Sequence, residues 1–257
     1  MGDTTPVLLH GHASAMMRLQ HDDREQDHPD IVRQEYSDPA RFAARWALWS
    51  RRTGPLAYDV AFDALLELEP KRVIELGCGP GDFAARVQAA GMHVVAFDQS
   101  HQMVELARAR GVDARIGTVE AIPSVEGAFD AAVANFMLYH VAELGRALGE
   151  LARVAPALIA ATMGYDQLRE MWSLVGRDLG RRQGLFMRET GEQLLRAHYG
   201  NVRMVDLPAT VEMSADDMRN YIANSVAHRH LVSRVPDFDG TRTITASTAV
   251  FIASNAS

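Results

Sequence analysis

A glycine-rich turn is the part of this sequence with the clearest chemistry. Gly77, Gly79 and Gly81 alternate with other residues directly after a short apolar run. Such a turn lets the backbone approach a ligand closely and presents amide donors at the start of a helix. Asp82 stands where a dinucleotide fingerprint would have its third glycine. The pattern therefore disfavours a pyrophosphate and favours a small zwitterionic ligand.

Asp98 is the second candidate for ligand binding. It ends the next apolar run, where a carboxylate can accept hydrogen bonds from both hydroxyls of a ribose. The alternative is that Asp98 caps the helix expected after Ser100. Ser100 is itself the better cap, so ribose binding is the favoured interpretation.

These residues lie in a pattern of alternating strands and helices. A strand is predicted over 72–76, and Asp82 opens a helix. Further strands are predicted over 93–97, 114–116, 131–134 and 158–162, with helices over 101–110 and 141–154 between them. This order is typical of parallel βαβ units. Strands over 202–207 and 243–253 are expected to form an antiparallel pair at the edge of the sheet.

Helical segments surround this pattern. Asp38 and Pro39 are suited to begin a helix, and a second helix is expected over 56–68. After the fifth strand, helical stretches are predicted over 165–178, 190–198 and from Ser214 onward. We expect residues 1–52 to form an N-terminal arm with lid helices. Residues 53–257 would form the main domain, with helical insertions near 165–200 and 214–233.

Four segments together resemble the class I methyltransferases, in the small-molecule branch called type 11. Glu75–Gly81 matches the first motif of that family, and Ala96–Met103 is similar to the second. Gly117–Pro123 resembles the adenine loop, and Phe129–Asn135 the fourth strand. The resemblance covers about residues 72–162. It implies an α/β fold with a Rossmann-like, mostly parallel seven-stranded sheet, helices on both faces, an antiparallel edge strand and a helical lid.

The resemblance also implies S-adenosylmethionine as the cofactor and assigns residues to it. The glycines would pass under the methionine part, Asp98 would bind ribose, Gln99 or Met103 would flank the adenine, and Asn135 would lie near the methionine amino group. Many relatives have aspartate where this chain has Thr118, so the Thr118 hydroxyl or the backbone at Val119 would replace that acceptor. The full set expected at the cofactor is Tyr36, Arg45, Glu75, Gly77, Cys78, Gly79, Gly81, Asp98, Gln99, Met103, Thr118, Val119, Glu120, Asn135 and Phe136.

Two members of that set have open alternatives. Tyr36 and Arg45 lie where relatives often have lid residues that close over the methionine carboxylate. Arg45 is equally well explained as a surface residue of a helix. Phe136 is equally well explained by core packing.

His140 and Tyr139 are the candidate catalytic residues. They follow the fourth strand, where relatives of this family face their methyl acceptor. Histidine can accept a proton from a hydroxyl or ammonium at neutral pH. His140 could instead bond a loop carbonyl, and Tyr139 could shape the acceptor pocket. Because alignment alone supplies much of the rate of methyl transfer, a base is sometimes unnecessary.

Composition narrows the class of partner. The formal net charge is −7, so the chain lacks the basic field that nucleic-acid binding usually requires. A single cysteine, Cys78, excludes a disulfide framework within the chain and fits a cytoplasmic protein. No signal peptide or membrane span is evident. His228 and His230 invite a metal site, but a solvated histidine pair is the commoner outcome, and no metal is expected.

The resulting prediction is transfer of a methyl group from S-adenosylmethionine to an oxygen or nitrogen of a small molecule, with natural product biosynthesis as the setting. The protein is expected to be a monomer or homodimer. The acceptor is expected between the lid and the ends of strands four and five. Trp46, Trp49, Trp172 and Phe186 would line that pocket or pack in the core. Two alternatives remain: an RNA methyltransferase, which needs a basic groove, and a noncatalytic regulator, which would lack an acceptor cavity.

Overall fold

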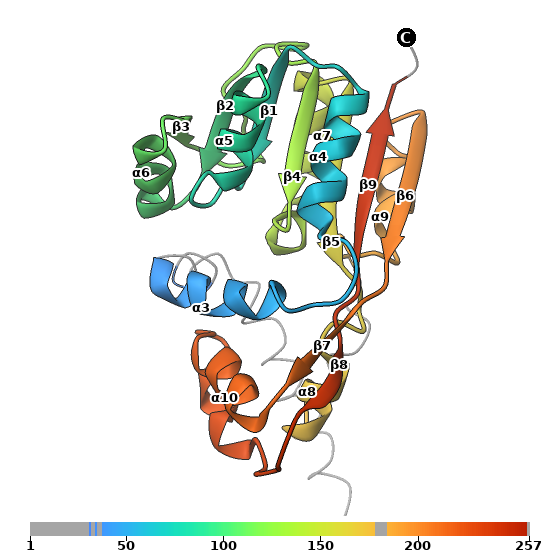
Figure 1. Cartoon of the computed structure of the whole chain (residues 1–257). Coiled ribbons are helices and arrows are strands. Elements are labelled where there is room, and N and C mark those ends of the chain that lie inside the picture. The colour runs from blue at the N-terminus through green and yellow to red at the C-terminus, as the bar shows by residue number, and fades with distance from the viewer. Residues whose placement is uncertain (1–30, 32–33, 35–37, 178–183, 256–257) are drawn as a thin grey trace, which may run out of the picture.

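The molecule is built around one seven-stranded sheet (Figure 1). The computed structural model describes residues 31, 34, 38–177 and 184–255, so Tyr36 lies outside the described residues. The strand order is β3-β2-β1-β4-β5-β9-β6. The bounds are β1 Arg72–Leu76, β2 His93–Asp98, β3 Asp113–Ile116, β4 Ala131–Asn135, β5 Ala157–Met163, β6 Asn201–Leu207 and β9 Thr248–Ser254. The predicted Rossmann-like, mostly parallel sheet is confirmed.

The antiparallel strand lies one position inside the predicted edge. β9 runs antiparallel to both β5 and β6, so β6 occupies the edge and is parallel to β5. The reason is burial: five of the seven residues of β9 are buried, whereas β6 is mostly exposed. A strand that is apolar on both faces is more stable in the interior of a sheet, and a polar strand such as β6 tolerates the edge.

Helices cover both faces of the sheet. On one face, α4 Ala57–Glu67, α5 Asp82–Ala89 and α6 His101–Ala109 pack against residues such as Val73 and Val133. On the other, α7 Leu144–Val154 and α9 Gly191–Leu195 cover Ile74 and its neighbours. Adjacent residues of β1 thus point into different cores, as the two-residue period of a strand requires.

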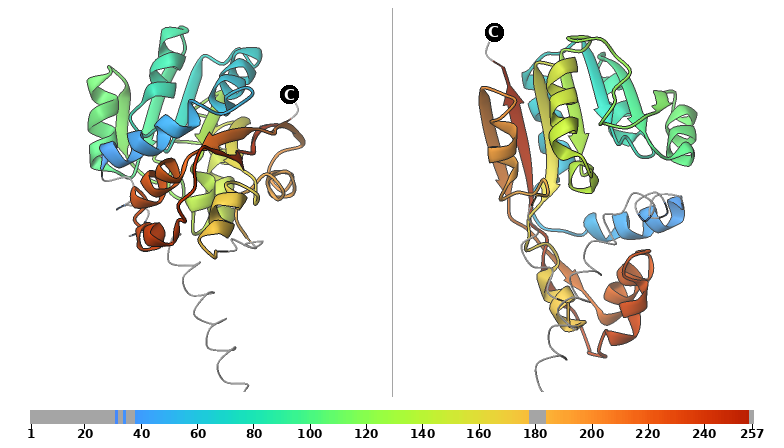
Figure 2. Two further views of the ribbon diagram at one scale, coloured as in Figure 1. Left: turned by 60° about the horizontal axis from the view of Figure 1, so that its bottom comes forward. Right: turned by 180° about the vertical axis from the view of Figure 1, so that it is seen from behind.

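A third, smaller core lies beyond the carboxyl ends of the parallel strands. It joins α8 Arg169–Leu174, α10 Ala215–Ala223, the 3₁₀ helix η2 Arg229–Arg234 and a two-stranded sheet. That sheet pairs β7 Thr210–Met213 with β8 Arg242–Thr245. Helix α3 Pro39–Trp49 adds Leu48 to this core and lies between it and the main sheet (Figures 1 and 2).

The ends of several elements differ from the predictions. The helix expected over 141–154 begins at Leu144, after the 3₁₀ helix η1 Leu138–His140. Of the predicted helix 165–178, the described residues 165–177 are helical only over α8, and 243–253 is split into β8 and β9. The predicted caps are present: Asp38 accepts from the Ala40 N–H, and Ser214 begins α10 with a capping box.

No helix in the described part of the chain is long and apolar enough to cross a membrane.

Candidate functional site

A cavity of about 420 Å³ lies at the carboxyl edge of the sheet. In parallel α/β sheets this edge is where ligands bind, because the strand ends and the following loops meet there. One side of the cavity is formed by the loops after β1, β2, β3 and β4. The other side is formed by α3, the loop after β5 and the third core. The cavity thus has a side made from the sequence motifs and a side made from segments outside them.

The glycine turn forms the first wall of the cavity. The Gly77 N–H donates to the Phe97 carbonyl at 2.7 Å, which fixes the turn to the end of β2. A side chain at Gly77 would lie 2.8 Å from the Cβ of Met137, whereas a Cβ at Gly79 would meet nothing within 4 Å. Gly77, Cys78 and Gly79 line the cavity. The turn is therefore closely packed behind Gly77 and open to a ligand at Gly79.

Gly81 has a different role from the other two glycines. It lies outside the cavity lining, at a φ of 84° that favours glycine. A Cβ there would lie 2.7 Å from the Cβ of Ala107 on α6. Gly81 thus allows α5 and α6 to pack closely. Because Gly81 does not line the cavity, the structure does not support its predicted contact with the cofactor.

Asp98 connects the first two motifs. One carboxylate oxygen accepts from the Ser100 N–H at 2.8 Å, and the other accepts from the Gly79 N–H at 2.9 Å. Each carboxylate oxygen can accept a further hydrogen bond. Burial raises the pKa of Asp98, and its bonds with backbone N–H groups oppose that rise. The side chain is held at the cavity wall and retains acceptor capacity for ribose hydroxyls, while Ser100 caps α6 as expected.

Glu75 lies behind the cavity wall instead of in its lining. Its side chain is 2% exposed, and its Oε2 has no hydrogen-bond partner among the described residues. Burial raises its pKa to about 8, with a further contribution from the charge of Asp98, while a bond from the Ala84 N–H opposes the rise. Below about pH 8 the Glu75 carboxyl is therefore protonated in the free protein, and a cationic ligand bound nearby would favour its ionised form.

The predicted adenine residues divide into two groups. Gln99, Thr118, Val119 and Glu120 line the cavity, so the loops after β2 and β3 meet as the family resemblance implies. Met103 does not line it, because its side chain lies on the inner side of α6 and is 1% exposed.

Asn135 ends β4, Phe136 follows it, and both line the cavity. Asn135 is 4% exposed, and neither polar atom of its amide has a hydrogen-bond partner in the described part of the chain. Phe136 has a φ of 55°, which is unusual for a bulky residue and is often found at functional sites. Its ring packs 5.6 Å from that of Tyr58. The end of β4 therefore presents a strained backbone and an unsatisfied amide to the cavity.

The two candidate catalytic side chains lie on η1, next to Asn135 and Phe136. Tyr139 and His140 both line the cavity, with ring centroids 4.3 Å apart. The His140 N–H donates to the Met137 carbonyl at 3.0 Å, which closes the 3₁₀ turn. The fold thus brings both side chains to the cavity, with Tyr139 near Arg45 of the opposite side.

Arg45 reaches the same cavity from α3. Burial lowers the pKa of its guanidinium, and the nearby hydroxyls of Tyr221 and Tyr139 oppose that change. It is therefore a half-buried cation facing the strand ends, and the surface-residue alternative does not hold. Trp46, Trp49 and Trp172 also line the cavity, whereas Phe186 is fully buried in the core.

Several lining residues lie outside the sequence motifs. His228 is 8% exposed, bonds to the Ser225 hydroxyl at 3.0 Å and packs 4.7 Å from the Trp172 ring. The prediction of a solvated histidine pair is therefore wrong for His228, although His230 is exposed. Sequence reasoning also missed Arg52, Tyr221, Gln167 and Thr248, which reach the cavity only because distant segments fold against it.

Comparisons with known proteins find a methyltransferase domain in this chain. Residues 74–156 match the family model described as a methyltransferase domain. The chain is 38% identical over 114 residues to demethylmenaquinone methyltransferase of Thermus thermophilus, covering 41% of this chain and 48% of the relative. It is 35% identical over 106 residues to malonyl-[acyl-carrier protein] O-methyltransferase of Erwinia billingiae, covering 39% and 42%.

The chain spans about half the length of these curated relatives. Among solved structures, a putative methyltransferase from Bacillus halodurans has the same fold, with a TM-score of 0.56 at 13% identity, over 77% of this chain and 99% of that one. Residues 74–156 are therefore similar to a methyltransferase domain, and the rest of the chain lies outside that match.

Proposed function

We propose that this protein transfers a methyl group from S-adenosylmethionine to an oxygen or nitrogen of a small-molecule acceptor. One observation carries the proposal: a single cavity is lined on one side by the cofactor motifs and continues between His140 and the third core. A noncatalytic binding protein would need only the first side. The enclosed second side is suited to an acceptor.

The residues of the first side fit this cofactor. Burial raises the pKa of Glu75 and Asp98, and the positive charge of a bound sulfonium or ammonium group would favour their ionised forms. Asn135 offers an unsatisfied amide for the amino acid part, and Gly79 leaves the backbone open to it. Arg45 is a cation suited to the carboxylate of the methionine part. When bound, S-adenosylmethionine supplies an activated methyl group.

The chain itself then has two tasks: to align the acceptor and to receive its proton. Alignment of two bound reactants supplies a large share of the acceleration in such reactions. His140 lines this cavity, and its imidazole can accept a proton from a hydroxyl or ammonium of the acceptor. Tyr139, beside it, orients the acceptor or the imidazole.

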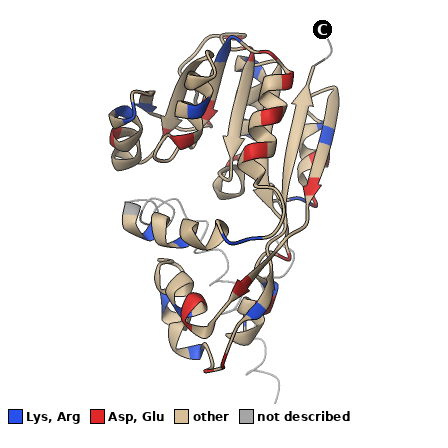
Figure 3. Cartoon of the chain, viewed as in Figure 1, with Lys and Arg blue, Asp and Glu red and all other residues tan. Residues whose placement is uncertain are grey.

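The charge distribution favours a small molecule over RNA as the acceptor. Figure 3 shows acidic and basic residues interspersed along the described ribbon, and the formal net charge is −7. A groove that follows a phosphate backbone requires clustered Lys and Arg. Natural product biosynthesis is the setting that we propose for such an enzyme.

The test combines binding with turnover. Calorimetry should detect S-adenosylhomocysteine binding to the full chain, with one ligand per protein molecule. Labelled S-adenosylmethionine should then transfer its methyl group to at least one member of a panel of small hydroxyl and amine compounds, and to no added RNA. Cofactor binding with label appearing only in RNA would contradict the small-molecule assignment. Absence of cofactor binding would contradict the whole proposal.

A further inference from the structure

Arg52 is a cation on the second side of the cavity, away from the sequence motifs. It follows α3 and lines the cavity. Its Nη2 donates to the Leu207 carbonyl at 3.4 Å, a long hydrogen bond, and its buried Nε has no hydrogen-bond partner among the described residues. No ion pair among the described residues involves Arg52. A half-buried guanidinium without a carboxylate partner is costly unless a ligand supplies one.

Thr248 presents a second unsatisfied group next to this cation. In the sheet register, Thr248 pairs with Leu207 on one side and with Met163 on the other. Arg52 bonds to the carbonyl of that same Leu207, so the guanidinium and Thr248 lie at the same point of the sheet edge. The Thr248 side chain is 4% exposed, lines the cavity, and its hydroxyl has no partner in the described structure.

Gln167 adds a third polar group on this side. It lies in the loop after β5, lines the cavity and is 8% exposed. Its Oε1 has no hydrogen-bond partner among the residues described. A buried carboxamide can accept from a hydroxyl of a ligand or donate to an anionic oxygen. Three polar side chains on one side of one cavity thus each have a buried atom without a hydrogen-bond partner among the described residues, which points to a polar ligand and not to core packing.

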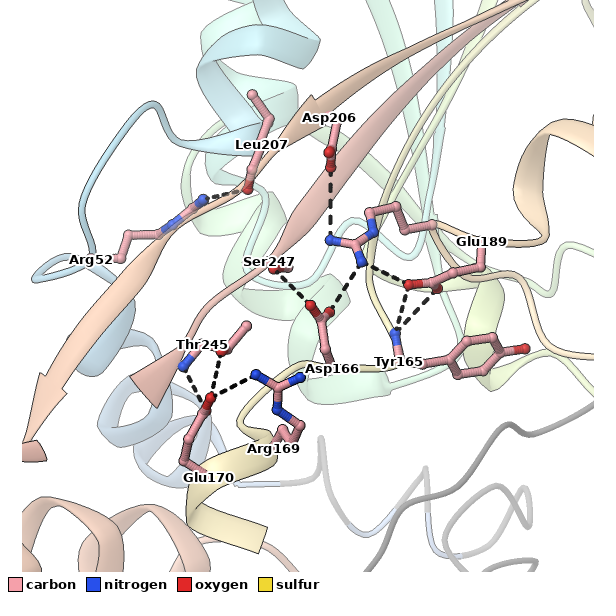
Figure 4. Close-up of polar contacts among 11 residues, drawn as sticks. Arg52, Tyr165, Asp166, Arg169, Glu170, Glu189, Asp206, Leu207, Thr245 and Ser247 are labelled. Carbon is pink, nitrogen blue, oxygen red and sulfur yellow. Dashed lines mark hydrogen bonds and ion pairs between the residues drawn. The ribbon is translucent and has the colours of Figure 1, made fainter. Parts of the chain in front are cut away.

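The charges of the lining indicate the sign of that ligand. Among the described residues, the carboxylates that line the cavity are Asp98 and Glu120, and both belong to the cofactor motifs. Three further carboxylates, Asp166, Glu189 and Asp206, lie near this edge but outside the lining. Arg188 contacts all three of them, at 3.4, 2.9 and 3.8 Å (Figure 4).

We propose that Arg52 and Thr248 bind a carboxylate of the methyl acceptor, which is an organic acid with an apolar body. This inference rests on the proposed function and specifies its substrate class. The Nε–H of Arg52 and the hydroxyl of Thr248 donate to the two carboxylate oxygens. The apolar body lies against Trp49 and Trp172, and the atom to be methylated lies toward His140. The carboxylate serves as an anchor that aligns the acceptor for transfer.

The test uses carboxylates and their primary amides as matched probes. Benzoate, 3-phenylpropanoate and hexanoate, each beside its amide, are titrated into the full-length protein loaded with S-adenosylhomocysteine. Thermal stabilisation measures binding in Arg52→Gln, Arg52→Lys and Thr248→Val. Arg203→Gln is the matched control, because it removes an exposed arginine of β6 outside the cavity. Binding of S-adenosylhomocysteine is measured separately by calorimetry for every variant.

We expect at least one carboxylate to bind the wild type and the Arg203 variant more tightly than its amide does. Arg52→Gln should weaken that binding by about 10- to 100-fold, the usual effect of losing a hydrogen bond to a charged group. Arg52→Lys should restore part of the affinity, and Thr248→Val should weaken it by about 3- to 10-fold.

Two results would overturn the inference while leaving the proposed function intact. One is that S-adenosylhomocysteine binds but no carboxylate is preferred over its amide. The other is that Arg52→Gln weakens S-adenosylhomocysteine itself by more than about threefold, which would assign Arg52 to the cofactor. Failure of S-adenosylhomocysteine to bind the wild type would instead refute the proposed function.

Discussion

The buried carboxyl group of Glu75 should make the stability of the free protein depend on pH. In the folded protein its pKa is about 8, against an ordinary value of 4.5. Between these two pH values the native state keeps a proton that the unfolded chain has released. Stability contributed by this group is therefore complete below pH 4.5 and is lost as the pH rises toward 8.

The size of the effect follows from the two pKa values. Each pH unit between them changes the free energy of unfolding by about 1.36 kcal/mol, so the loss by pH 7 is on the order of 3 kcal/mol. Glu75→Gln cannot titrate and keeps the acceptor for the Ala84 N–H, so this slope should disappear. Its buried amide nitrogen has its own desolvation cost, which shifts the whole curve but does not depend on pH.

Urea denaturation at a series of pH values from 5 to 8 measures this directly. The wild type should lose stability relative to Glu75→Gln as the pH rises. Glu105→Gln, which changes an exposed carboxylate of α6, should keep the slope of the wild type. Parallel curves for the wild type and Glu75→Gln would refute the reasoning, because Glu75 would then ionise alike in both states.

The other predictions concern the cofactor turn and the site of transfer. Asp98→Asn should weaken S-adenosylhomocysteine by about 10- to 100-fold in calorimetry, because the ribose hydroxyls lose a charged acceptor; unchanged affinity in a folded variant would remove Asp98 from the site. His140→Gln should lower the single-turnover rate by about 10²–10⁴ with cofactor affinity retained, and a fall of less than about threefold at saturating acceptor would exclude a general base. Gly81→Ala should lower the free energy of unfolding by about 2 kcal/mol or more through contact with Ala107. Gly79→Ala should mainly weaken the cofactor, and equal losses of stability in the two glycine variants would contradict the different roles assigned to them.

The parts of the structure that were predictable depend on short-range patterns. β1 occupies residues 72–76 as predicted, because a short β-branched run followed by glycines is a local signal. Ser100 and Ser214 cap their helices for the same reason. The cofactor side of the cavity follows from these elements, since the carboxyl ends of parallel strands always meet at one edge.

The parts that were missed depend on contacts between distant segments. The run 243–253 reads as one strand, and only its pairing divides it: β8 pairs with β7, whereas β9 pairs with β5 and β6. From the sequence, His228 is interpreted as a surface residue, whereas in the structure Trp172 of α8 packs against it. Arg52 shows no periodic signal at all, and it becomes a lining residue because the chain after α3 crosses the end of β6.

The connection between β6 and β9 has a consequence for how this fold can diversify. The chain leaves the main sheet after Leu207 and re-enters it at Thr248, and these two residues are cross-strand partners. Everything between them, including α10 and η2, is therefore an excursion whose two ends are adjacent. Segments of this kind can be lengthened, shortened or exchanged without changing the register of the strands that flank them. Under the proposed function, natural variation or laboratory recombination over residues 208–247 is expected to change acceptor choice and to leave the glycine turn and Asp98 in place.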